Sequence, residues 1–472
     1  MLATLAGCGG VEADARETVT TAASRPDSLA FRSAPSVRPP RVEVRTKRRG
    51  RTPGFTFHTP SGGAGRYGLL IADDDGQPIW HRSTKGFASD LRVQRYQGEP
   101  VLTWWEGKRV RGWGEGEFVI VGSDYREIAR FRAGGGREGD LHEFVITDED
   151  TALVTIYSAG QRDMRSVGGP RRGRVVDSIA QEIDIATGRV LFEWSALEDI
   201  ALRESYKPVP EDPRESWDFF HINSVDVDTD GNLLVSARNT YAVYKIDRRT
   251  GEIIWRLGGK RSDFRMGPGS RFAWQHDARR APDGTLTLFD NQAAPKRAEE
   301  SRALVLDVDE RKMRVTRARE YTHPRELLSS NKANAQTLAN GNVMVGWGFH
   351  PYFTEYSRSG RIVFDARFAD PENVSYRSYR FRWTGRPAGR PAVAARPSGD
   401  GMTVYASWNG ATEVTEWQVS AGRTRESLAP VVRGRRRGFE TALRMRSAAP
   451  CVAVEALNRQ GEALGSSPVR CR

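Results

Sequence analysis

The sequence predicts an all-β protein, and three observations lead to this fold class. Its 472 residues include 47 Gly and 24 Pro, and hydrophobic residues make up 38%, a composition typical of turn-rich β-structure. Short apolar strands alternate with Asp-Gly and Asn-Gly turns through most of the chain. Two patterns also repeat at long intervals, which indicates that one unit of β-structure recurs.

The first repeat is a hairpin whose opening strand begins on a polar residue and whose return strand is apolar. The clearest copies read HINSVDVDTDGNLLVSARN from His221 and QHDARRAPDGTLTLFDN from Gln275. Two further copies begin at Leu141 and Asn334, and a weaker fifth copy begins at Asp90. Turns of this chemistry join adjacent antiparallel strands, so each copy predicts a β-hairpin.

The second repeat is a turn followed by an aromatic or apolar strand, as in TGEIIWRLGG. Its six copies are marked by Gly76, Tyr125, Gly188, Gly251, Arg311 and Gly360. The steps between these markers are 49, 63, 63, 60 and 49 residues. Six units of four short strands predict a six-bladed β-propeller over residues 51–378, with seven blades as the alternative.

The segments on either side of this region differ from it in composition. Residues 9–50 are rich in Ala, Ser, Pro and Arg without periodicity, which predicts a disordered tether. Residues 379–472 begin with a Gly- and Pro-rich linker and continue as alternating strands, which predicts a small fibronectin-like β-sandwich. We expect Cys451 and Cys471 to form a disulfide that joins its last strands.

The third cysteine predicts how the chain is attached to the cell. Cys8 follows Leu5-Ala6-Gly7, a lipobox-like sequence, so residues 1–8 are interpreted as the remnant of a lipoprotein signal peptide, although a basic start is lacking. We expect the protein to lie outside a bacterial cell membrane, to which a lipid on Cys8 anchors it, with secretion as the alternative location. The alternative for the lipobox itself is a chance match. No apolar run approaches the ~20 residues of a membrane-spanning helix.

The charge of the chain is strongly basic, with a net charge of +12 and 63 Arg against 9 Lys. A nucleic-acid partner is one interpretation of such a charge. The arginines are spread through loops among 60 acidic residues, and no basic helix is present, so no nucleic-acid partner is expected. An Arg-rich cleft for sulfate or phosphate esters suits guanidinium chemistry. No Cys/His spacing is typical of zinc, and neither a metal nor a cofactor is expected.

Three of the 7 histidines stand at or beside the opening of a repeat: His142, His221 and His276. Antiparallel pairing about the Asp-Gly turn of its hairpin places His221 opposite Arg238, and strand alternation puts Asn223 on the same face. Imidazole, carboxamide and guanidinium together predict a site for an oxyanion. The alternative is a structural polar network at the end of the unit.

The neighbouring copy carries Gln275-His276-Asp277, and its return strand ends in Asp290-Asn291. The same arithmetic places Asp290 opposite His276. A carboxylate beside an imidazole fixes its tautomer and raises its basicity, so His276 is a candidate nucleophile or general base. Asp277, Asp290 and Asn291 are predicted to support it.

The other two copies complete the expected pocket. In one, His142 is placed opposite Tyr157; in the other, Asn334 and Gln336 supply polar groups that do not titrate, and Gln336 is a supporting residue. Because the units recur around a ring, we expect these side chains to converge on one axial pocket.

Four blocks of sequence together resemble the arylsulfotransferase family: HINSVDVDTDGNLLVSARNT, TGEIIWRLGG, FAWQHDARRAPDGTLTLFDN and AQTLANGNVMVGWG. The similarity covers most of residues 55–370. SWNGATEVTEWQVSAG resembles the β-sandwich appended to the Gram-positive and fungal-type branch. The resemblance implies a six-bladed propeller that transfers a sulfuryl group from an aryl sulfate to a phenolic acceptor without phosphoadenylyl sulfate or any cofactor.

The resemblance also implies a role for each candidate residue. His276 matches the histidine that becomes transiently sulfated. His221, Asn223 and Arg238 match the residues that bind the sulfuryl oxygens, and His142 matches a further channel histidine that transfers protons or binds sulfate. The alternative function is a non-catalytic, surface-anchored propeller that binds a sulfated or anionic ligand, such as a glycan or cell-wall polymer.

Overall fold

The computed structural model describes residues 27–471, and the regular secondary structure of this part of the chain is almost entirely antiparallel β-sheet. The prediction of an all-β protein is confirmed. Helical structure in the described residues is limited to single turns: α1 (Ala196–Asp199), η1 (Arg165–Val167) and η2 (Leu202–Glu204). None of the described helices has the length and apolarity needed to cross a membrane.

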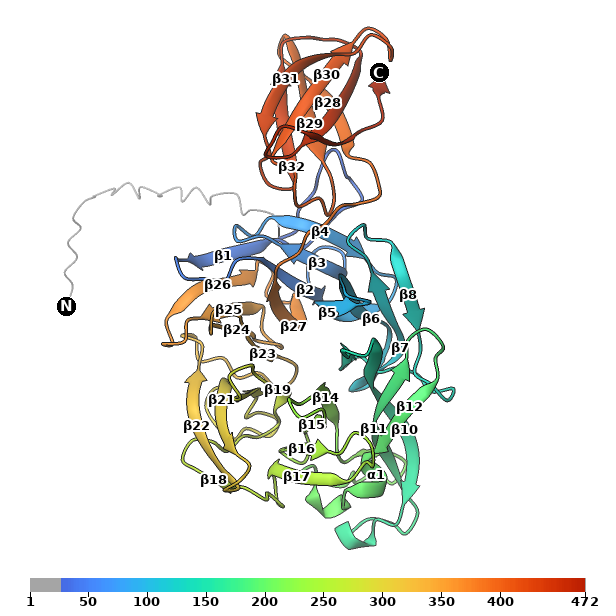
Figure 1. Ribbon diagram of the computed structural model, residues 1–472, viewed down its shortest axis with the longest axis vertical. Coiled ribbons are helices and arrows are strands. Elements are labelled where there is room, and N and C mark those ends of the chain that lie inside the picture. Colours follow the sequence, from blue (N-terminus) through green and yellow to red (C-terminus); the bar gives the residue numbers. More distant parts are fainter. Residues whose placement is uncertain (1–26, 472) are drawn as a thin grey trace, which may run out of the picture.

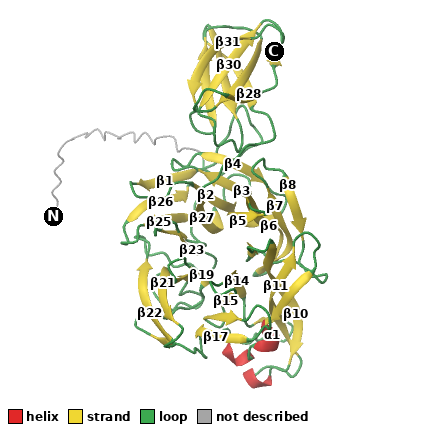
Figure 2. Ribbon diagram, viewed as in Figure 1, coloured by secondary structure: helices red, strands yellow, loops and turns green. Residues whose placement is uncertain are grey.

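Six sheets, arranged in a ring, account for the strands between Val42 and Phe381 (Figures 1 and 2). The first contains β2 (Phe55–Ser61), β3 (Gly68–Ala72), β4 (Pro78–Ser83) and β27 (Val374–Phe381). The second contains β5 (Phe87–Tyr96), β6 (Glu99–Val110), β7 (Trp113–Val121) and β8 (Glu127–Phe131). The third contains β9 (Phe144–Ile146), β10 (Thr151–Arg162), β11 (Gly173–Asp184), β12 (Val190–Ser195) and β13 (Trp217–Asp218).

The other three sheets follow in chain order. The fourth contains β14 (Ile222–Val227), β15 (Leu233–Ala237), β16 (Ala242–Ile246) and β17 (Ile253–Gly258). The fifth contains β18 (Arg265–Met266), β19 (His276–Arg280), β20 (Leu286–Asp290), β21 (Arg302–Asp309) and β22 (Arg314–Tyr321). The sixth contains β23 (Asn334–Thr337), β24 (Val343–Gly346), β25 (Tyr352–Tyr356), β26 (Ile362–Phe368) and β1 (Val42–Lys47).

Contacts between neighbouring sheets close the ring. Strand β27 contacts β5, β5 contacts β9, and β10 of the same third sheet contacts β14. The cycle continues from β14 to β19, from β19 to β23, and from β23 back to β27. Buried apolar clusters fill the spaces between the sheets; one of them joins Trp217 of the third sheet to Val235 and Tyr244 of the fourth. Each sheet therefore buries its faces against its two neighbours.

The ring is closed by strands from both ends of this region, and this corrects two predicted boundaries. Strand β1 pairs with β26, from Val42 opposite Phe368 to Lys47 opposite Phe364. The predicted tether over residues 9–50 is therefore wrong for this segment. The residues VEVRTK alternate between less and more exposed side chains, with Val42 buried and the charged side chains more exposed. This pattern suits an edge strand, but the surrounding arginines made it hard to recognise in the sequence.

The second boundary concerns the end of the ring. Strand β27 pairs with β2, from Phe55 opposite Phe381 to Ser61 opposite Val374. The predicted division at 378/379 therefore cuts through a strand, and the ring extends to Phe381. Residues 9–26, together with the predicted signal remnant 1–8 and its Cys8, lie outside the described residues.

The C-terminal part forms two further sheets that stand beside the ring in Figure 1. One contains β28 (Ala392–Ser398), β29 (Gly401–Ser407) and β32 (Glu440–Met445). The other contains β30 (Glu416–Gly422), β31 (Ala429–Arg435), β33 (Cys451–Leu457), β34 (Ala463–Ser466) and β35 (Arg470–Cys471). Both contribute to one core that includes Val404, Trp417 and Val454. The predicted disulfide is confirmed, since Cys451 and Cys471 are bonded and join β33 to β35.

Candidate functional site

The three predicted histidines converge. His142, His221 and His276 line one cavity of about 320 Å³. All three are buried, with 3%, 9% and 1% of their surface exposed. Each of the six sheets, or the segment leading into that sheet, contributes to the lining of the cavity. The residues, from the first sheet to the sixth, are Tyr376, Trp113, His142, His221, His276 and Lys332. The cavity therefore lies on the common axis of the ring.

The hairpin of β14 and β15 brings His221 and Arg238 together, as the pairing arithmetic predicts. The Arg238 backbone N–H donates to the His221 carbonyl at 2.9 Å, and both side chains line the cavity. The register then shifts between Ile222 and Ser224. Asn223 is turned away by this irregularity: its side-chain amide donates to the Gln275 carbonyl at 2.7 Å, and it is not among the residues that line the cavity.

Two of the histidines are each paired with an aspartate. Nδ1 of His221 lies 2.5 Å from Oδ2 of Asp218, and Nδ1 of His142 lies 2.6 Å from Oδ2 of Asp140. A carboxylate accepts from Nδ1–H, so in the neutral ring Nε2 carries the lone pair. The two rings are nearly perpendicular, with centroids 5.1 Å apart. This geometry suits a pair of imidazoles that exchange protons with a substrate.

Burial lowers the pKa of His221, and the neighbouring Asp218 carboxylate offsets part of this effect. The pKa of Asp218 is itself lowered, because its pairing with His221 and the nearby cations outweighs the opposing effect of burial. Asp218 therefore stays anionic at neutral pH. An anion bound beside the His221 ring would raise the pKa of His221, since an opposite charge favours the protonated form.

His276 is held differently from the other two histidines. Its Nδ1 lies 2.7 Å from Oδ1 of Asn291 and 3.1 Å from the Trp274 carbonyl oxygen. Nδ2 of Asn291 donates to the carbonyls of Ser329 and Lys332, which fixes the orientation of the amide. Since both neighbours of Nδ1 are acceptors, Nδ1 must carry the proton and Nε2 the lone pair.

The charge state of His276 also suits a nucleophile. Its pKa lies well below the ordinary value because the ring is buried, and Arg238, His221 and His142 add to this effect. At neutral pH the ring is therefore uncharged and keeps the lone pair that a nucleophile requires.

The predicted pairing of His276 with Asp290 is wrong. The register shifts between His276 and Arg279, so that His276 lies opposite Phe289, and Asp277 adopts a φ of 57°. Asp290 accepts instead from the Ala273 backbone N–H at 2.9 Å and from Nε of Arg302 at 3.0 Å. The neutral carboxamide of Asn291 therefore lies next to His276, where the predicted strand pairing had placed the carboxylate of Asp290.

Arg238 lines the same cavity as the three histidines, and its charge acts on His221 and His276. Its guanidinium lies 4.7 Å from the Trp274 ring centroid and donates to Oδ1 of Asn239 and to the Ser330 carbonyl at 3.1 and 3.2 Å. Within residues 27–471 it has no carboxylate partner in a salt bridge. A cation held by neutral acceptors retains its charge for an incoming oxyanion.

Aromatic side chains form one wall. The Trp113 ring is stacked on Tyr157, with centroids 5.4 Å apart and planes 1° from parallel. The ring centroids of Tyr157 and His142 are 5.5 Å apart. The predicted alignment of these two residues is off by one position, since the strands pair Phe144 with Val154. Phe87 and Tyr376 line the cavity as well, so it offers both apolar faces and charge to a substrate with an aromatic ring.

The residues that follow two of the histidines form an ionic network on the other side. Arg377, fully buried, donates to Glu143 at 3.2 Å, to Asp90 at 3.0 Å and to the Asn223 carbonyl at 2.9 Å. It also lies 3.5 Å from Asp277. Arg279, Arg377 and Arg92 hold the pKa of Glu143 well below its usual range, against the opposing effect of burial. Asp277 is therefore part of this network and not a direct partner of His276.

A second cavity of about 500 Å³ lies beyond this network, and Asp277 contributes to its lining. It contains Gln336, whose Nε2 donates to the Arg380 carbonyl at 3.1 Å and whose Oε1 accepts from the Arg380 N–H at 2.8 Å. The predicted supporting residue Gln336 therefore does not reach the histidines.

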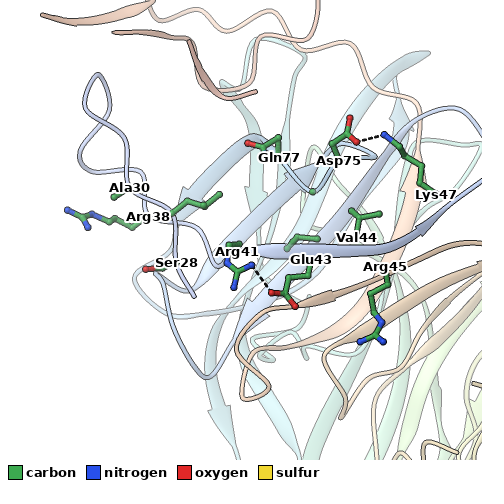
Figure 3. Close-up of a pocket in the computed structure, with 13 residues that line it drawn as sticks. Ser28, Ala30, Arg38, Arg41, Glu43, Val44, Arg45, Lys47, Asp75 and Gln77 are labelled. Atoms are coloured by element: carbon green, nitrogen blue, oxygen red, sulfur yellow. Dashed lines mark hydrogen bonds and ion pairs between the residues drawn. The ribbon is translucent and has the colours of Figure 1, made fainter. Parts of the chain in front are cut away.

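The largest groove lies elsewhere, between the N-terminal segment, β1 and the turn before β4 (Figure 3). It contains none of the predicted site residues. Its labelled side chains include Arg41, which donates to Glu43 at 2.7 Å, and Lys47, which pairs with Asp75. Since these charges are satisfied within the groove, it is a weaker candidate than the axial cavity.

Sequence reasoning missed several residues of the site. Asp140 and Asp218 stand two and three residues before their histidines, and this proximity could have revealed both of them. Trp113 begins strand β7, Lys332 lies in a segment with left-handed backbone, and Tyr376 belongs to β27, the last strand of the ring. No local pattern marks them, because only the closed ring brings them to the axis.

Comparisons with known proteins support a family assignment. The arylsulfotransferase (ASST) family profile matches residues 92–369, which is more than half of the chain. No curated protein matches it.

Among solved structures, a protein of unknown function from Bacteroides caccae is 14% identical, with a TM-score of 0.40, and the match covers 69% of this chain and 98% of that one. A Lactobacillus plantarum protein is 12% identical, with a TM-score of 0.37, covering 82% and 98%. Virginiamycin B lyase from Staphylococcus aureus is 8% identical, with a TM-score of 0.33, covering 80% and 94%. Scores this low carry no argument, and the assignment rests on the family profile: the chain belongs to the arylsulfotransferase family.

Proposed function

We propose that this protein transfers a sulfuryl group from an aryl sulfate to a phenolic acceptor, with His276 as the transient carrier. One observation carries the proposal. A neutral imidazole with its lone pair on Nε2 shares an axial cavity with an arginine that has no carboxylate partner in the described chain. Family membership supports a sulfotransferase activity in general.

In the first step, Nε2 of His276 attacks sulfur, an N–S bond forms, and the S–O bond to the aryl group breaks. The aryl oxygen leaves as phenolate or takes a proton from His142 or His221. Arg238 and protonated His221 donate to the sulfuryl oxygens as charge develops on them. The proton stays on Nδ1, where the carbonyl oxygens of Asn291 and Trp274 accept its hydrogen bonds and stabilise the positive charge of the sulfated ring.

In the second step, a phenolic acceptor occupies the place of the departed phenol. His142 or His221 removes the phenol proton, and the paired Asp140 or Asp218 stabilises the imidazolium that results. The phenol oxygen attacks sulfur, the N–S bond breaks, and His276 is regenerated. Because the donor product leaves before the acceptor reacts, the kinetics are expected to be ping-pong.

A chromogenic aryl sulfate tests the proposal when it is supplied with and without a phenol acceptor. We expect release of the chromogenic phenol that depends on the acceptor, and parallel lines in double-reciprocal plots at several acceptor concentrations. His350→Gln is a matched control, because the His350 ring donates from Nε2 to the Leu328 carbonyl and does not line the cavity. Binding of the aryl sulfate without turnover would instead identify a non-catalytic anion-binding protein.

The same proposal includes the architecture. We interpret the six sheets as the blades of a β-propeller and the two C-terminal sheets as a fibronectin-like β-sandwich. The cycle of contacts from β27 through β5, β14 and β23 supports the first interpretation, and the core shared by the two C-terminal sheets supports the second.

The proposed location is outside the bacterial cell membrane, with a lipid on Cys8 as the anchor. The bonded pair Cys451–Cys471 supports an oxidising compartment. Fractionation of the native host, followed by a mass measurement of the N-terminal peptide, tests this: an acylated Cys8 is expected, and a soluble cytoplasmic protein with free thiols at both C-terminal cysteines contradicts it.

A further inference from the structure

The axial cavity carries more positive charge than one sulfate group requires. Besides Arg238, its lining includes four cations: Arg109, Arg111, Lys207 and Lys332. In the part of the chain that the structure describes, none of the four forms a salt bridge. Lys108, next to Arg109 but outside the cavity, shows the contrast, since its Nζ lies 3.0 Å from Glu115.

Two of these cations lie at the closed end of the hairpin formed by β6 and β7. Arg109 precedes the turn, and its guanidinium lies 5.2 Å from the Phe87 ring centroid. Arg111 stands in the turn next to Gly112, where a β-carbon would lie only 3.5 Å from Cε1 of His221. The turn therefore reaches the histidines and places its arginines at the rim of the same cavity.

Lys332 approaches from the sixth sheet. Its carbonyl accepts a hydrogen bond of 3.2 Å from Asn291, the residue that orients His276. Its backbone is left-handed, with a φ of 65°. Burial lowers its pKa to about 8, and the charge of Arg109 adds to the effect. The ammonium is thus mostly charged at neutral pH and lies close enough to Arg109 to be repelled by it.

The carboxylates of the cavity do not neutralise this set. Only Glu215 and Asp218 are found among the lining residues, and Asp218 is engaged with His221. Unpaired like charges in a partly buried site raise the free energy of the folded protein. An anion bound between them relieves this repulsion. One sulfate monoanion placed at Arg238 and His276 leaves without a partner the four rim cations, Arg109, Arg111, Lys207 and Lys332.

We propose that the natural donor carries a second anionic group in addition to the sulfate ester that is transferred. This inference rests on the proposed function and deepens it by naming the substrate class: a dianionic aryl sulfate whose second group is a carboxylate, phosphate or further sulfate. The transferred sulfate lies at Arg238 and His276, the aryl ring lies along Phe87 and Trp113, and the second anion lies at the rim cations.

A pair of synthetic donors tests the inference. Both are nitrophenyl sulfates; one bears a ring carboxylate and the other bears the isosteric, neutral carboxamide at the same position. The readout is the ratio of their kcat/KM values with one saturating phenol acceptor. A ratio of about ten in favour of the carboxylate is expected at low ionic strength, because several partly exposed ion pairs act together, and the ratio should fall as salt is added.

Variants locate the second anion. Arg109→Gln and Lys332→Met should each reduce the ratio about threefold, which is the effect of losing one partly exposed ion pair. The carboxamide donor, which lacks the second anion, should lose less kcat/KM than the carboxylate donor in each variant. Lys108→Gln is the matched control on the same hairpin, and its ratio should equal that of the unchanged protein. Thermal melting of each variant confirms that the fold is retained.

The possible outcomes separate the two proposals. Equal kcat/KM values for the two donors in the unchanged protein overturn the dianionic donor and leave sulfuryl transfer intact. A fall in rate that is the same for both donors in the Lys332 variant shows that this lysine stabilises the leaving phenolate, and also overturns the inference for that residue. Absence of turnover with either donor contradicts the proposed function itself.

Discussion

His276 differs from its two neighbours in the group that holds Nδ1. Aspartates hold His142 and His221, whereas a carboxamide and a backbone carbonyl hold His276. A carboxylate favours the imidazolium, and neutral acceptors fix the tautomer without that effect. The difference divides the three rings into one suited to forming a covalent bond and two suited to moving protons.

Arg238 is predicted to act on both charge development and the pKa of His276. Arg238→Gln should lower kcat/KM by about 10²–10³, the cost of losing one oxyanion donor. Neutral His276 is the active form, so activity is lost as pH falls through its pKa. Because burial and then Arg238 lower that pKa, the acid limb should lie below pH 6.5 and should move upward in the variant. The pH dependence of kcat/KM measures both effects.

Arg238→Lys is the control for this prediction. It keeps the positive charge, so the acid limb should stay low even though the rate falls. An acid limb that is unchanged in Arg238→Gln would show that Arg238 does not act on the charge state of His276.

The hairpins show what the sequence can predict at the scale of an element. The arithmetic about a tight turn gives the right pairing for His221 and Arg238, because the register shift between Ser224 and Ile222 brings Ile222 opposite Ala237. It fails for Asn223 and for Asp290, since a register shift follows within one or two residues in each hairpin. A bulge leaves no reliable mark in a single sequence, and it decides which side chain faces the axis.

Strand β1 tests the corrected N-terminal boundary. Val42→Ala should lower the free energy of unfolding by about 1.5 kcal/mol, because two buried methyl groups are removed. Lys47→Gln on the same strand should change it by less than about 0.5 kcal/mol, since Lys47 and Asp75 are exposed. Urea unfolding measures both, and equal effects would contradict the pairing of β1 with β26.

At the scale of the whole molecule, closure of the ring brings distant residues to one axis. The repeat spacing predicted recurring units, and the repeat openings predicted the three histidines. Trp113, Lys332 and Arg377 could not be predicted, because they reach the centre only when β27 pairs with β2 and β1 with β26. The site residues that stand at the openings of the sequence repeats could therefore be predicted from the sequence. Those that reach the axis only when the ring of sheets closes could not.

The ionic network around Arg377 is predicted to hold the ring together. Arg377→Met should destabilise the protein by about 3–5 kcal/mol, because Glu143 and Asp90 would be left buried without this partner. The double variant with Glu143→Gln should recover part of the loss, since one buried carboxylate is then removed. Thermal unfolding is the measurement, and a double variant less stable than the sum of its parts would contradict this account.

The central claim is that the sulfuryl group passes through His276. The most direct measurement is to mix the protein with a radiolabelled aryl sulfate in the absence of acceptor, quench it in alkali, where an N–S bond to imidazole survives, and map the labelled peptide. The account predicts one label per chain on His276, lost when a phenol is added before the quench and absent in His276→Ala. Turnover in His276→Ala, or a label on His142 or His221 instead, would contradict it.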